Sequence, residues 1–478
     1  MKNILDYNIY ELQDKLKKGN VTSTELTKAC LKQIEETKEL NSLISVNAEY
    51  ALSLAEKADK EIAEGKSGAL LGVPVIVKDN LSTTEFDTTC ASKMLEGYRA
   101  PYNATVVQKL LDAGAVILGK ANMDEFAMGG SGENSAFGKT LNPLDHSRVP
   151  GGSSSGSACA VASKQCYASL GSDTGGSIRQ PSSFCGVVGL KPTYGRVSRY
   201  GLVAFASSLD QVGPITKCVK DSAIMLEAIC GYDKHDGTTV DGKDVKFVDK
   251  IRNSVRGLKI GVAKEYFDMI NNKEVKKAIE DAVEFYRENG AEIVNISLPS
   301  VDKALADYYI LSSAEASSNL ARYDGIKYGK RAKDAENLLD IYYNTRTKYF
   351  GKEVKRRIML GNYCLSAGYH DQYYNKAQEV RNALKQEFAI ALKKCDAIIS
   401  PTAPTTAFKF GEKATPLDMY LADIFTVPAN LTGLPAISFK VGKDENGMPI
   451  GCQLIANYFE EGTLFNLANY YEVTKELK

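Results

Sequence analysis

Gly151-Gly-Ser-Ser-Ser-Gly-Ser157 and Leu170-Gly-Ser-Asp-Thr-Gly-Gly-Ser-Ile-Arg-Gln-Pro181 are the two stretches on which the organisation of this chain depends. Both are rich in glycine and serine and hold few bulky side chains, so many backbone N–H groups can approach one point. The stabilisation of a developing oxyanion requires such an arrangement. Small residues also let two segments simply pack closely, and the loops alone leave both interpretations open.

A serine in either loop needs a base before it can attack an amide. The chain has three histidines, His146, His235 and His370, and none stands within ligand spacing of another. A lysine kept neutral by burial is an alternative base. Lys78 ends the apolar run Val73-Pro-Val-Ile-Val77, where a buried strand would deliver its side chain from the core to a cleft. A charged residue that ends a strand at the surface would fit the same position.

Three other motif-like stretches indicate different chemistry only weakly. Gly114-Ala-Val-Ile-Leu-Gly-Lys120 approaches a phosphate loop, but Ala121 stands where that loop needs Ser or Thr, and its apolar middle is typical of a strand. Asp173-Thr-Gly175 occurs once, whereas aspartic proteases need two carboxylates that share a proton. Gly152-Ser-Ser-Ser-Gly156 fits a nucleophile elbow, but its lead-in is typical of a loop and no downstream histidine has a suitable setting.

The hydrophobic pattern on either side of the loops predicts an α/β fold. The first 65 residues are typical of helices, and Thr22-Ser-Thr-Glu25 has the spacing of a capping box. Residues 300–395 are also mostly helical in pattern and rich in tyrosine. The pattern predicts strands at 70–77, 115–119, 258–262, 291–296, 397–400, 436–441 and 451–454, and helices at 105–113, 157–168 and 272–289. Strands that alternate with helices indicate a partly parallel sheet.

Composition excludes several other classes of protein. The chain has 478 residues, and its 59 basic and 59 acidic side chains balance to a net charge of zero. That balance argues against direct binding of nucleic acid through a broad basic surface. No apolar run approaches the ~18 residues of a membrane span, and no secretory signal is visible. The ten cysteines include no C-x-x-C pair, so we expect no metal site and a reducing, cytoplasmic location.

The two loops, together with Cys185-Gly-Val-Val-Gly-Leu-Lys-Pro-Thr-Tyr-Gly-Arg196, resemble the signature of the amidase signature family. Three further stretches are similar to the glutamine-hydrolysing A subunits of tRNA-dependent amidotransferases, which belong to that family. These stretches are 122–129, 197–214 and 353–361. The similarity covers nearly the whole chain. It implies the amidase-signature fold, a central mixed β-sheet covered by helices on both faces, and we expect a single domain spanning residues 1–478.

The resemblance implies a role for each reactive side chain. Lys78 matches the base, Ser153 matches a relay serine that follows a cis peptide bond, and Ser177 matches the nucleophile. We expect Asp173 and Arg179, which flank the nucleophile, to pair and hold the loop rather than to react. Four backbone N–H groups match the oxyanion hole of the family, those of Thr174, Gly175, Gly176 and Ser177.

The resemblance also implies a binding site for glutamine, to which the helical insertion at 300–395 contributes. Its residues match Tyr308, Arg357 and Asp423, although the neighbouring Tyr309 and Arg356 leave the tyrosine and the arginine open by one position. An arginine fork suits an α-carboxylate and an aspartate suits an α-ammonium group, so a free amino acid fits this site.

In an assembly of this kind, the chain would bind no cofactor of its own. The ammonia would convert Glu-tRNA(Gln) to Gln-tRNA(Gln) on a tRNA-binding B subunit that uses ATP and Mg²⁺, with a small C subunit completing a heterotrimer. Whether Asp-tRNA(Asn) is also served stays open. The alternative is a stand-alone hydrolase of small amides. A purely structural role without activity is disfavoured by the intact Lys78, Ser153 and Ser177.

Overall fold

In the computed structural model of the chain, the apolar run that ends at Lys78 forms β2 (Pro74–Lys78), a strand buried at every residue. Its neighbours β3 (Val116–Ala121) and β4 (Ala168–Asp173) run parallel to it and are equally buried. Because successive side chains of a strand point to opposite faces, burial of every residue means that both faces of the sheet are covered here.

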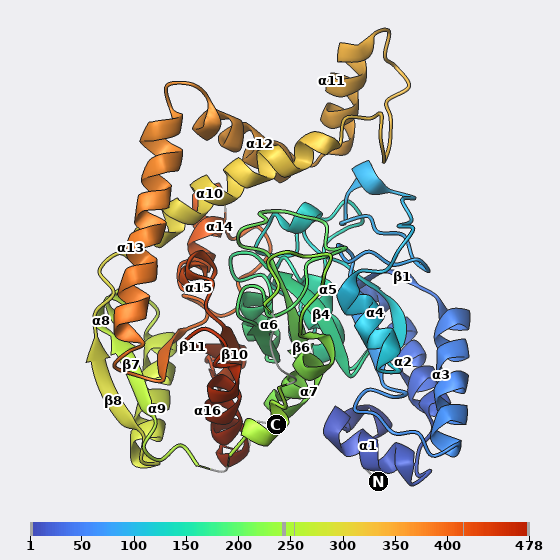
Figure 1. Cartoon of the computed structure of the whole chain (residues 1–478), viewed down its shortest axis with the longest axis vertical. Coiled ribbons are helices and arrows are strands. Elements are labelled where there is room, and N and C mark those ends of the chain that lie inside the picture. Colours follow the sequence, from blue (N-terminus) through green and yellow to red (C-terminus); the bar gives the residue numbers. More distant parts are fainter. Residues whose placement is uncertain (1–2, 241–244, 253, 414, 476–478) are drawn as a thin grey trace.

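The structure describes residues 3–240, 245–252, 254–413 and 415–475. Within them, one sheet of 11 strands has the order β1-β3-β2-β4-β6-β5-β10-β11-β9-β7-β8 (Figure 1). The other strands are β1 (Leu43–Val46), β5 (Val188–Lys191), β6 (Gln211–Thr216), β7 (Lys259–Ala263), β8 (Glu292–Ile296), β9 (Ala397–Pro401), β10 (Ala436–Lys443) and β11 (Pro449–Ala456). Pairing is parallel around β2 and β7 and antiparallel elsewhere, which confirms the predicted mixed α/β sheet.

Helices surround this sheet (Figure 1). They are α1 (Ile9–Lys17), α2 (Ser23–Glu36), α3 (Ala48–Ala63), α4 (Thr105–Asp112), α5 (Ser155–Ala162), α6 (Arg179–Cys185), α7 (Val219–Ile229), α8 (Lys264–Asp268), α9 (Lys273–Glu288), α10 (Ala304–Asn319), α11 (Leu338–Tyr349), α12 (Lys352–Leu365), α13 (Lys376–Ala391), α14 (Pro416–Tyr420), α15 (Val427–Thr432) and α16 (Glu461–Thr474). One sheet that runs through both halves of the chain supports the proposal of a single domain.

The parallel pairing of β2 with β4 brings the functional segments to one edge of the sheet. Val77 is in register with Leu170, so the carboxyl ends of both strands lie side by side. From β4 the chain passes through the loop at 174–178 into α6, and the other serine loop leads directly into α5. The strand that carries Lys78 and both Gly/Ser loops therefore converge there, as ligand sites do at the carboxyl ends of parallel strands.

The central glycine-rich region holds more regular structure than its sequence predicts. The hydrophobic pattern does not indicate β4, β5 and β6, nor the short β1. The helix predicted at 157–168 begins two residues earlier, as α5, and ends at Ala162. The chain then turns through Lys164, whose φ is 62°, and enters β4. Pairing with β2 and β6 imposes this strand, although its small residues have little intrinsic preference for it.

The N-terminal region begins with helices, as predicted, and contributes only one short strand to the edge of the sheet. The predicted capping box is confirmed at the start of α2. The side chain of Thr22 accepts a hydrogen bond from the Glu25 N–H, and the Glu25 carboxylate accepts one from the Thr22 N–H. Leu26 and Cys30, one turn apart, are fully buried. The capped helix therefore presents one apolar face to the core.

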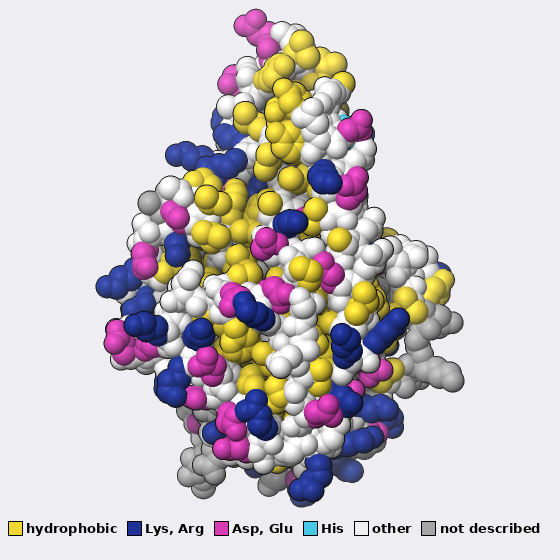
Figure 2. Space-filling view, turned by 90° about the vertical axis from the view of Figure 1, so that its left-hand side faces the viewer, with side chains coloured by type: hydrophobic (Ala, Val, Ile, Leu, Met, Phe, Trp, Pro, Cys, Tyr) yellow, Lys and Arg dark blue, Asp and Glu magenta, His cyan; other side chains and the backbone are white. Residues whose placement is uncertain are grey.

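Residues 300–395 contain the four helices α10 to α13, which confirms the predicted helical character. α10 and α12 lie across one end of the molecule, and α11 projects beyond them (Figure 1). This projection carries the exposed Leu338, Leu339 and Tyr343. Figure 2 shows one face of the whole molecule, on which acidic and basic side chains are interspersed. This mixture agrees with the zero net charge.

Replacing Thr22 by alanine should destabilise the fold by about 1 kcal/mol, the usual cost of losing an N-cap. Thermal unfolding measures the effect as a lower Tm. Lys28→Ala is the matched control, because Lys28 is an exposed residue on the same helix. Equal Tm values for the two variants would contradict the role of the capping box.

Candidate functional site

Lys78 is fully buried at the end of β2 and lies among serine side chains. Its Nζ is 2.8 Å from Ser153 Oγ, 2.9 Å from Ser154 Oγ and 2.9 Å from Ser172 Oγ. A fourth oxygen, the carbonyl of Ser172, lies at 3.3 Å. The structure thus brings together the lysine and the first serine of the Gly-Gly-Ser-Ser loop, as predicted. Ser154 and Ser172 are the other two serines whose hydroxyls contact Lys78, and neither was predicted from the sequence.

Burial lowers the pKa of Lys78 to about 7, because an ammonium group in this setting has lost its hydration. The negative charges of Asp124, Asp173 and Asp210 act in the opposite direction and limit the shift. Near neutral pH a large fraction of Lys78 is therefore an uncharged amine that can accept a proton.

Ser153 and Ser177 come from two different loops that are hydrogen-bonded to each other. The peptide bond between Gly152 and Ser153 is cis, as the resemblance implied. The next N–H along, that of Ser154, donates to the carbonyl of Ser177 at 3.0 Å and ties the loops together. Ser177 is partly exposed, whereas its neighbours in the loop are buried. Among the described residues, no protein group hydrogen-bonds to the Ser177 hydroxyl, which leaves it available to a ligand.

The loop that leads to Ser177 presents unpaired N–H groups. Those of Thr174, Gly175 and Ser177 make no hydrogen bond within the described part of the chain. The Gly176 N–H is different, because it donates to Asp173 Oδ1 at 2.9 Å. Of the four N–H groups that the resemblance matches to an oxyanion hole, three are therefore without a partner in the described residues, and the fourth is bonded to Asp173.

The expected pairing of Asp173 with Arg179 is present and fully buried. Arg179 Nη2 lies 3.0 Å from Asp173 Oδ1, and Nε lies 3.1 Å from Oδ2. The same guanidinium donates to Asn430 Oδ1 and to Gln453 Oε1, both at 2.6 Å. Burial by itself would raise the pKa of Asp173, but the Arg179 charge and these hydrogen bonds hold it well below its usual range. These contacts support the prediction that the pair holds the loop rather than reacts.

Arg357 and Asp423 are both buried and both contact Tyr309, whereas Arg356 is half exposed. Arg357 Nε donates to Glu353 Oε1 at 2.7 Å, and its Nη1 is buried without a hydrogen-bond partner. Its guanidinium lies 4.5 Å from the ring centre of Tyr309. The Tyr309 hydroxyl donates to Asp423 Oδ2 at 3.1 Å. Of the two arginines left open by the sequence, Arg357 is the one that is buried against Tyr309.

Tyr308 and Tyr309 have separate places in the site. Tyr308 packs against the loop at 174–178, because a Cβ added to Gly175 would lie 2.4 Å from Tyr308 Cζ. Tyr309 instead links Arg357 to Asp423. Burial raises the pKa of Asp423 to about 7, although the hydrogen bond from Tyr309 and the charge of Arg357 oppose the shift. Tyr308 therefore contacts the loop of Ser177, and Tyr309 contacts both charged side chains.

Two residues that hydrogen-bond to the loop at 174–178 were not predicted from the sequence. Asp210, which immediately precedes β6, accepts a hydrogen bond from Thr174 Oγ1 at 2.6 Å. Thr426, just before α15, donates its hydroxyl to the Gly175 carbonyl at 2.6 Å. Both lie far from the loop in sequence, so no local spacing could indicate them.

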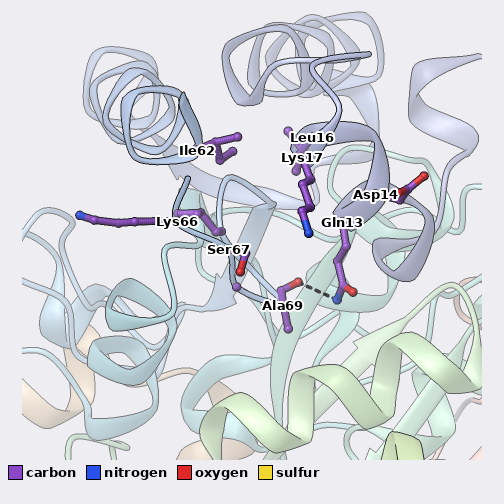
Figure 3. Close-up of a pocket in the computed structure, with 10 residues that line it drawn as sticks. Gln13, Asp14, Leu16, Lys17, Ile62, Lys66, Ser67 and Ala69 are labelled. Carbon is purple, nitrogen blue, oxygen red and sulfur yellow. Dashed lines mark hydrogen bonds between the residues drawn. The ribbon is translucent and has the colours of Figure 1, made fainter. Parts of the chain in front are cut away.

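Other features of the surface lie apart from this site. A pocket of about 350 Å³ between α1 and α3 is lined by Gln13, Lys17, Ile62 and Lys66 (Figure 3). None of its lining residues comes from the serine loops. Within the described ranges, no helix is both long and apolar enough to cross a membrane. No group of three or more His, Cys, Asp or Glu in those ranges is arranged to hold a metal ion.

The sequence matches the Amidase family over residues 25–465. The chain belongs to the amidase family. It is 55% identical, over 97% of its own length and 95% of the relative's, to the A subunit of the glutamyl-tRNA(Gln) amidotransferase of Caldanaerobacter subterraneus subsp. tengcongensis. A crystal structure of the A subunit of the Thermotoga maritima glutamyl-tRNA(Gln) amidotransferase is 44% identical, with a TM-score of 0.82 over 99% of this chain and 95% of that one.

A second structural neighbour from the amidase family is more distant in sequence. The native peptide amidase of Stenotrophomonas maltophilia is 30% identical and has a TM-score of 0.85 over 98% of this chain and 97% of that one. The likeness to both neighbours confirms the predicted amidase-signature fold.

Arg179→Lys should both destabilise the chain and slow its reaction, because lysine keeps the charge but loses the planar fork that binds Asp173, Asn430 and Gln453 together. The expected loss of stability is up to about 3–5 kcal/mol, the cost of breaking a buried ion pair. Thermal unfolding and amide hydrolysis measure the two effects.

The matched control for this change is Arg196→Lys. Arg196 forms a buried pair with Glu461 at 2.9 Å and makes no contact with the serine loops. That variant should lose stability and keep its rate. If Arg179→Lys retained full rate and stability, the loop-holding role of the Asp173 pair would be wrong.

Proposed function

We propose that this chain is the glutamine-hydrolysing A subunit of a tRNA-dependent amidotransferase, and that Lys78, Ser153 and Ser177 carry the hydrolysis. The observation that carries the proposal is a buried lysine with a pKa near 7 whose Nζ lies 2.8 Å from the Ser153 hydroxyl, in a loop that is hydrogen-bonded to the loop of Ser177. The 55% identity to the A subunit of a glutamyl-tRNA(Gln) amidotransferase supports the assignment to this particular enzyme.

The hydrogen bonds around Lys78 indicate the direction of proton transfer. A neutral amine has two N–H donors and one lone pair. The hydroxyl of Ser154 donates to the Ser172 carbonyl, at 3.2 Å, so it is free to accept from Lys78. Ser172 Oγ accepts from Asn80 at 2.9 Å and can likewise accept from Lys78. Two N–H groups are thereby used, and the lone pair is left for the proton of Ser153.

Ser177 would then attack the carboxamide carbon while its proton passes to Ser153 and the proton of Ser153 passes to Lys78. The oxyanion of the tetrahedral intermediate is stabilised by the N–H groups of Thr174, Gly175 and Ser177. The same relay in reverse protonates the nitrogen, which leaves as ammonia. The acyl ester on Ser177 is hydrolysed by water, whose proton follows the same route.

The charged side chains Arg357 and Asp423 suit free glutamine. The unpartnered Nη1 of Arg357 can bind the α-carboxylate, and Asp423 can bind the α-ammonium group. A bound ammonium group would also favour the ionised form of Asp423, whose pKa burial raises to about 7. Tyr308, packed on Gly175, would lie between these charges and the reacting amide.

The partner chains complete the reaction in this proposal. Ammonia released at Ser177 would reach a tRNA-binding B subunit, where Glu-tRNA(Gln) is activated with ATP and Mg²⁺, and a small C subunit would join them in a cytoplasmic heterotrimer. The zero net charge of this chain suits a protein that leaves most tRNA contacts to its partner. The second candidate function is a stand-alone amidase, favoured by the likeness to a peptide amidase structure.

Ser177→Ala should abolish ammonia release from glutamine, because the acyl intermediate can no longer form. The measurement compares the chain alone with the chain purified together with its B and C subunits. In the complex we expect wild-type release to rise sharply and the variant to stay at background. Ser157→Ala is the matched control, since its buried hydroxyl donates to the Leu170 carbonyl outside the relay.

Each result of this comparison separates the candidate functions. Unchanged release from Ser177→Ala would overturn the nucleophile assignment. Rapid hydrolysis of varied small amides by the chain alone, with no response to the partners, would instead identify a stand-alone amidase.

The rate at saturating glutamine should rise with pH through about 7, because only the neutral form of Lys78 accepts a proton. Below that value kcat should fall about tenfold per pH unit. Asp423 has a pKa in the same range, so Asp423→Asn is the control: its kcat profile should keep the same midpoint although its KM is higher. A kcat that stays level between pH 5 and 8 would contradict the role of Lys78.

A further inference from the structure

The oxyanion loop is fixed at three points by side chains from three different segments. Thr174 Oγ1 donates to Asp210, Gly176 N–H donates to Asp173 Oδ1 at 2.9 Å, and the Gly175 carbonyl accepts from Thr426 Oγ1 at 2.6 Å. The last two contacts act on one peptide group, because the Gly175 carbonyl and the Gly176 N–H share a plane. That plane is therefore held at both ends.

This peptide plane determines where the free N–H groups of the loop point. The N–H of Gly175 precedes it and the N–H of Ser177 follows it, and both are unpaired among the described residues. If the carbonyl of Gly175 lost its partner, the plane could rotate about the flanking bonds of two glycines, which restrict rotation least. Gly176 has a φ of +129°, a conformation that L side chains rarely adopt.

Thr426 also fills the space that the glycines leave. A Cβ added to Gly176 would lie 2.2 Å from Thr426 Oγ1, so the loop approaches this residue as closely as a glycine allows. Thr426 itself is fully buried, and its carbonyl accepts from Arg179 Nη1 at 3.0 Å. The guanidinium of Arg179 thus binds both Thr426 and Asp173.

The third contact of Thr426 is with Asp423. Its N–H donates to the Asp423 carbonyl at 3.0 Å, and its hydroxyl lies 3.0 Å from the same oxygen. A hydroxyl has one proton, and the shorter distance assigns it to the Gly175 carbonyl. One turn of chain therefore connects the carboxylate that would bind the substrate ammonium to the peptide that orients the oxyanion donors.

We propose that Thr426 is a positioning residue for amide hydrolysis: its hydroxyl fixes the Gly175–Gly176 peptide and so aims the N–H groups of Gly175 and Ser177 at the oxyanion. The inference rests on the proposed function of Ser177. Because the hydroxyl acts on the transition state through the loop, its loss lowers kcat, while Arg357 and Asp423 still bind the ground state of glutamine.

The test replaces Thr426 by valine, which keeps the shape and removes the donor, and by serine, which keeps the donor. Both are purified in complex with the partner chains, and ammonia release is measured over a range of glutamine concentrations. We expect Thr426→Val to lower kcat by about 10- to 100-fold, somewhat less than the loss of an oxyanion donor, with KM within about threefold of wild type. Thr426→Ser should recover most of the rate.

Thr432→Val is the matched control. Thr432 lies in α15, is as buried as Thr426 and donates its hydroxyl to the Pro428 carbonyl at 2.7 Å, away from the loop. Its kcat should stay at the wild-type value. A Thr426→Val enzyme with wild-type kcat, or with a raised KM alone, would overturn the inference. So would a Thr426→Ser enzyme as slow as the valine variant.

Failure of the proposed function gives a different result. In that case the wild-type complex itself would release no ammonia from glutamine, or its release would persist in Ser177→Ala. Misfolding is recognised separately, because Tm would fall in Thr426→Val and the serine variant, which keeps both fold and donor, would still report on the hydroxyl.

Discussion

The removal of Lys78 from water is the constraint on which the rest of this structure depends. A buried ammonium group is costly, and the protein meets that cost by shifting the lysine toward its neutral form. Burial requires an inner strand covered on both faces, which β2 supplies. The remaining polarity of the amine requires acceptors, which the serine hydroxyls supply. The burial of Lys78 therefore requires the strand end, the two serine loops and the covered sheet together.

A second buried interaction, that of Arg179, joins segments from the two halves of the chain at this site. Arg179 joins Asp173, at the end of β4, to Asn430 in α15 and Gln453 in β11. Its planar fork satisfies all three at once, which a point charge could not do. Because α15 follows directly on Asp423 and Thr426, the same contacts set the distance between Asp423 and the loop of Ser177.

The parts of the fold that could be predicted are those in which side-chain chemistry decides the structure. The runs at 258–262 and 397–400 are rich in β-branched residues, and both form strands at the predicted places. Ala168–Asp173 was missed because Ala, Ser and Gly have little strand preference, and its neighbours on the sheet impose the extended form. In such a segment local sequence carries less information than tertiary pairing.

The same distinction applies to the site. Composition and spacing made Lys78 and the two serine loops plausible but left other interpretations open, and the resemblance to the amidase signature assigned roles to Lys78, Ser153 and Ser177. The order of sheet strands is what brings Asp210 and Thr426 to the loop, and no spacing along the chain encodes that order. Gly176 gives a further example, because the resemblance matched its N–H to an oxyanion hole and did not indicate that this N–H donates to Asp173.

The acidic residues around the site have two effects that must be balanced. Asp173 and Asp210 hold the oxyanion loop in shape, and Asp124 accepts the Gly132 and Asn134 N–H groups. Their charges also raise the pKa of Lys78 against the effect of burial. Without them the lysine would be neutral over a wider pH range but would be a weaker base. A pKa near the working pH combines a useful fraction of neutral amine with adequate basicity. Asp173 and Asp210 therefore hold the loop and also raise the pKa of Lys78. A change at either residue affects both the shape of the loop and the basicity of the lysine.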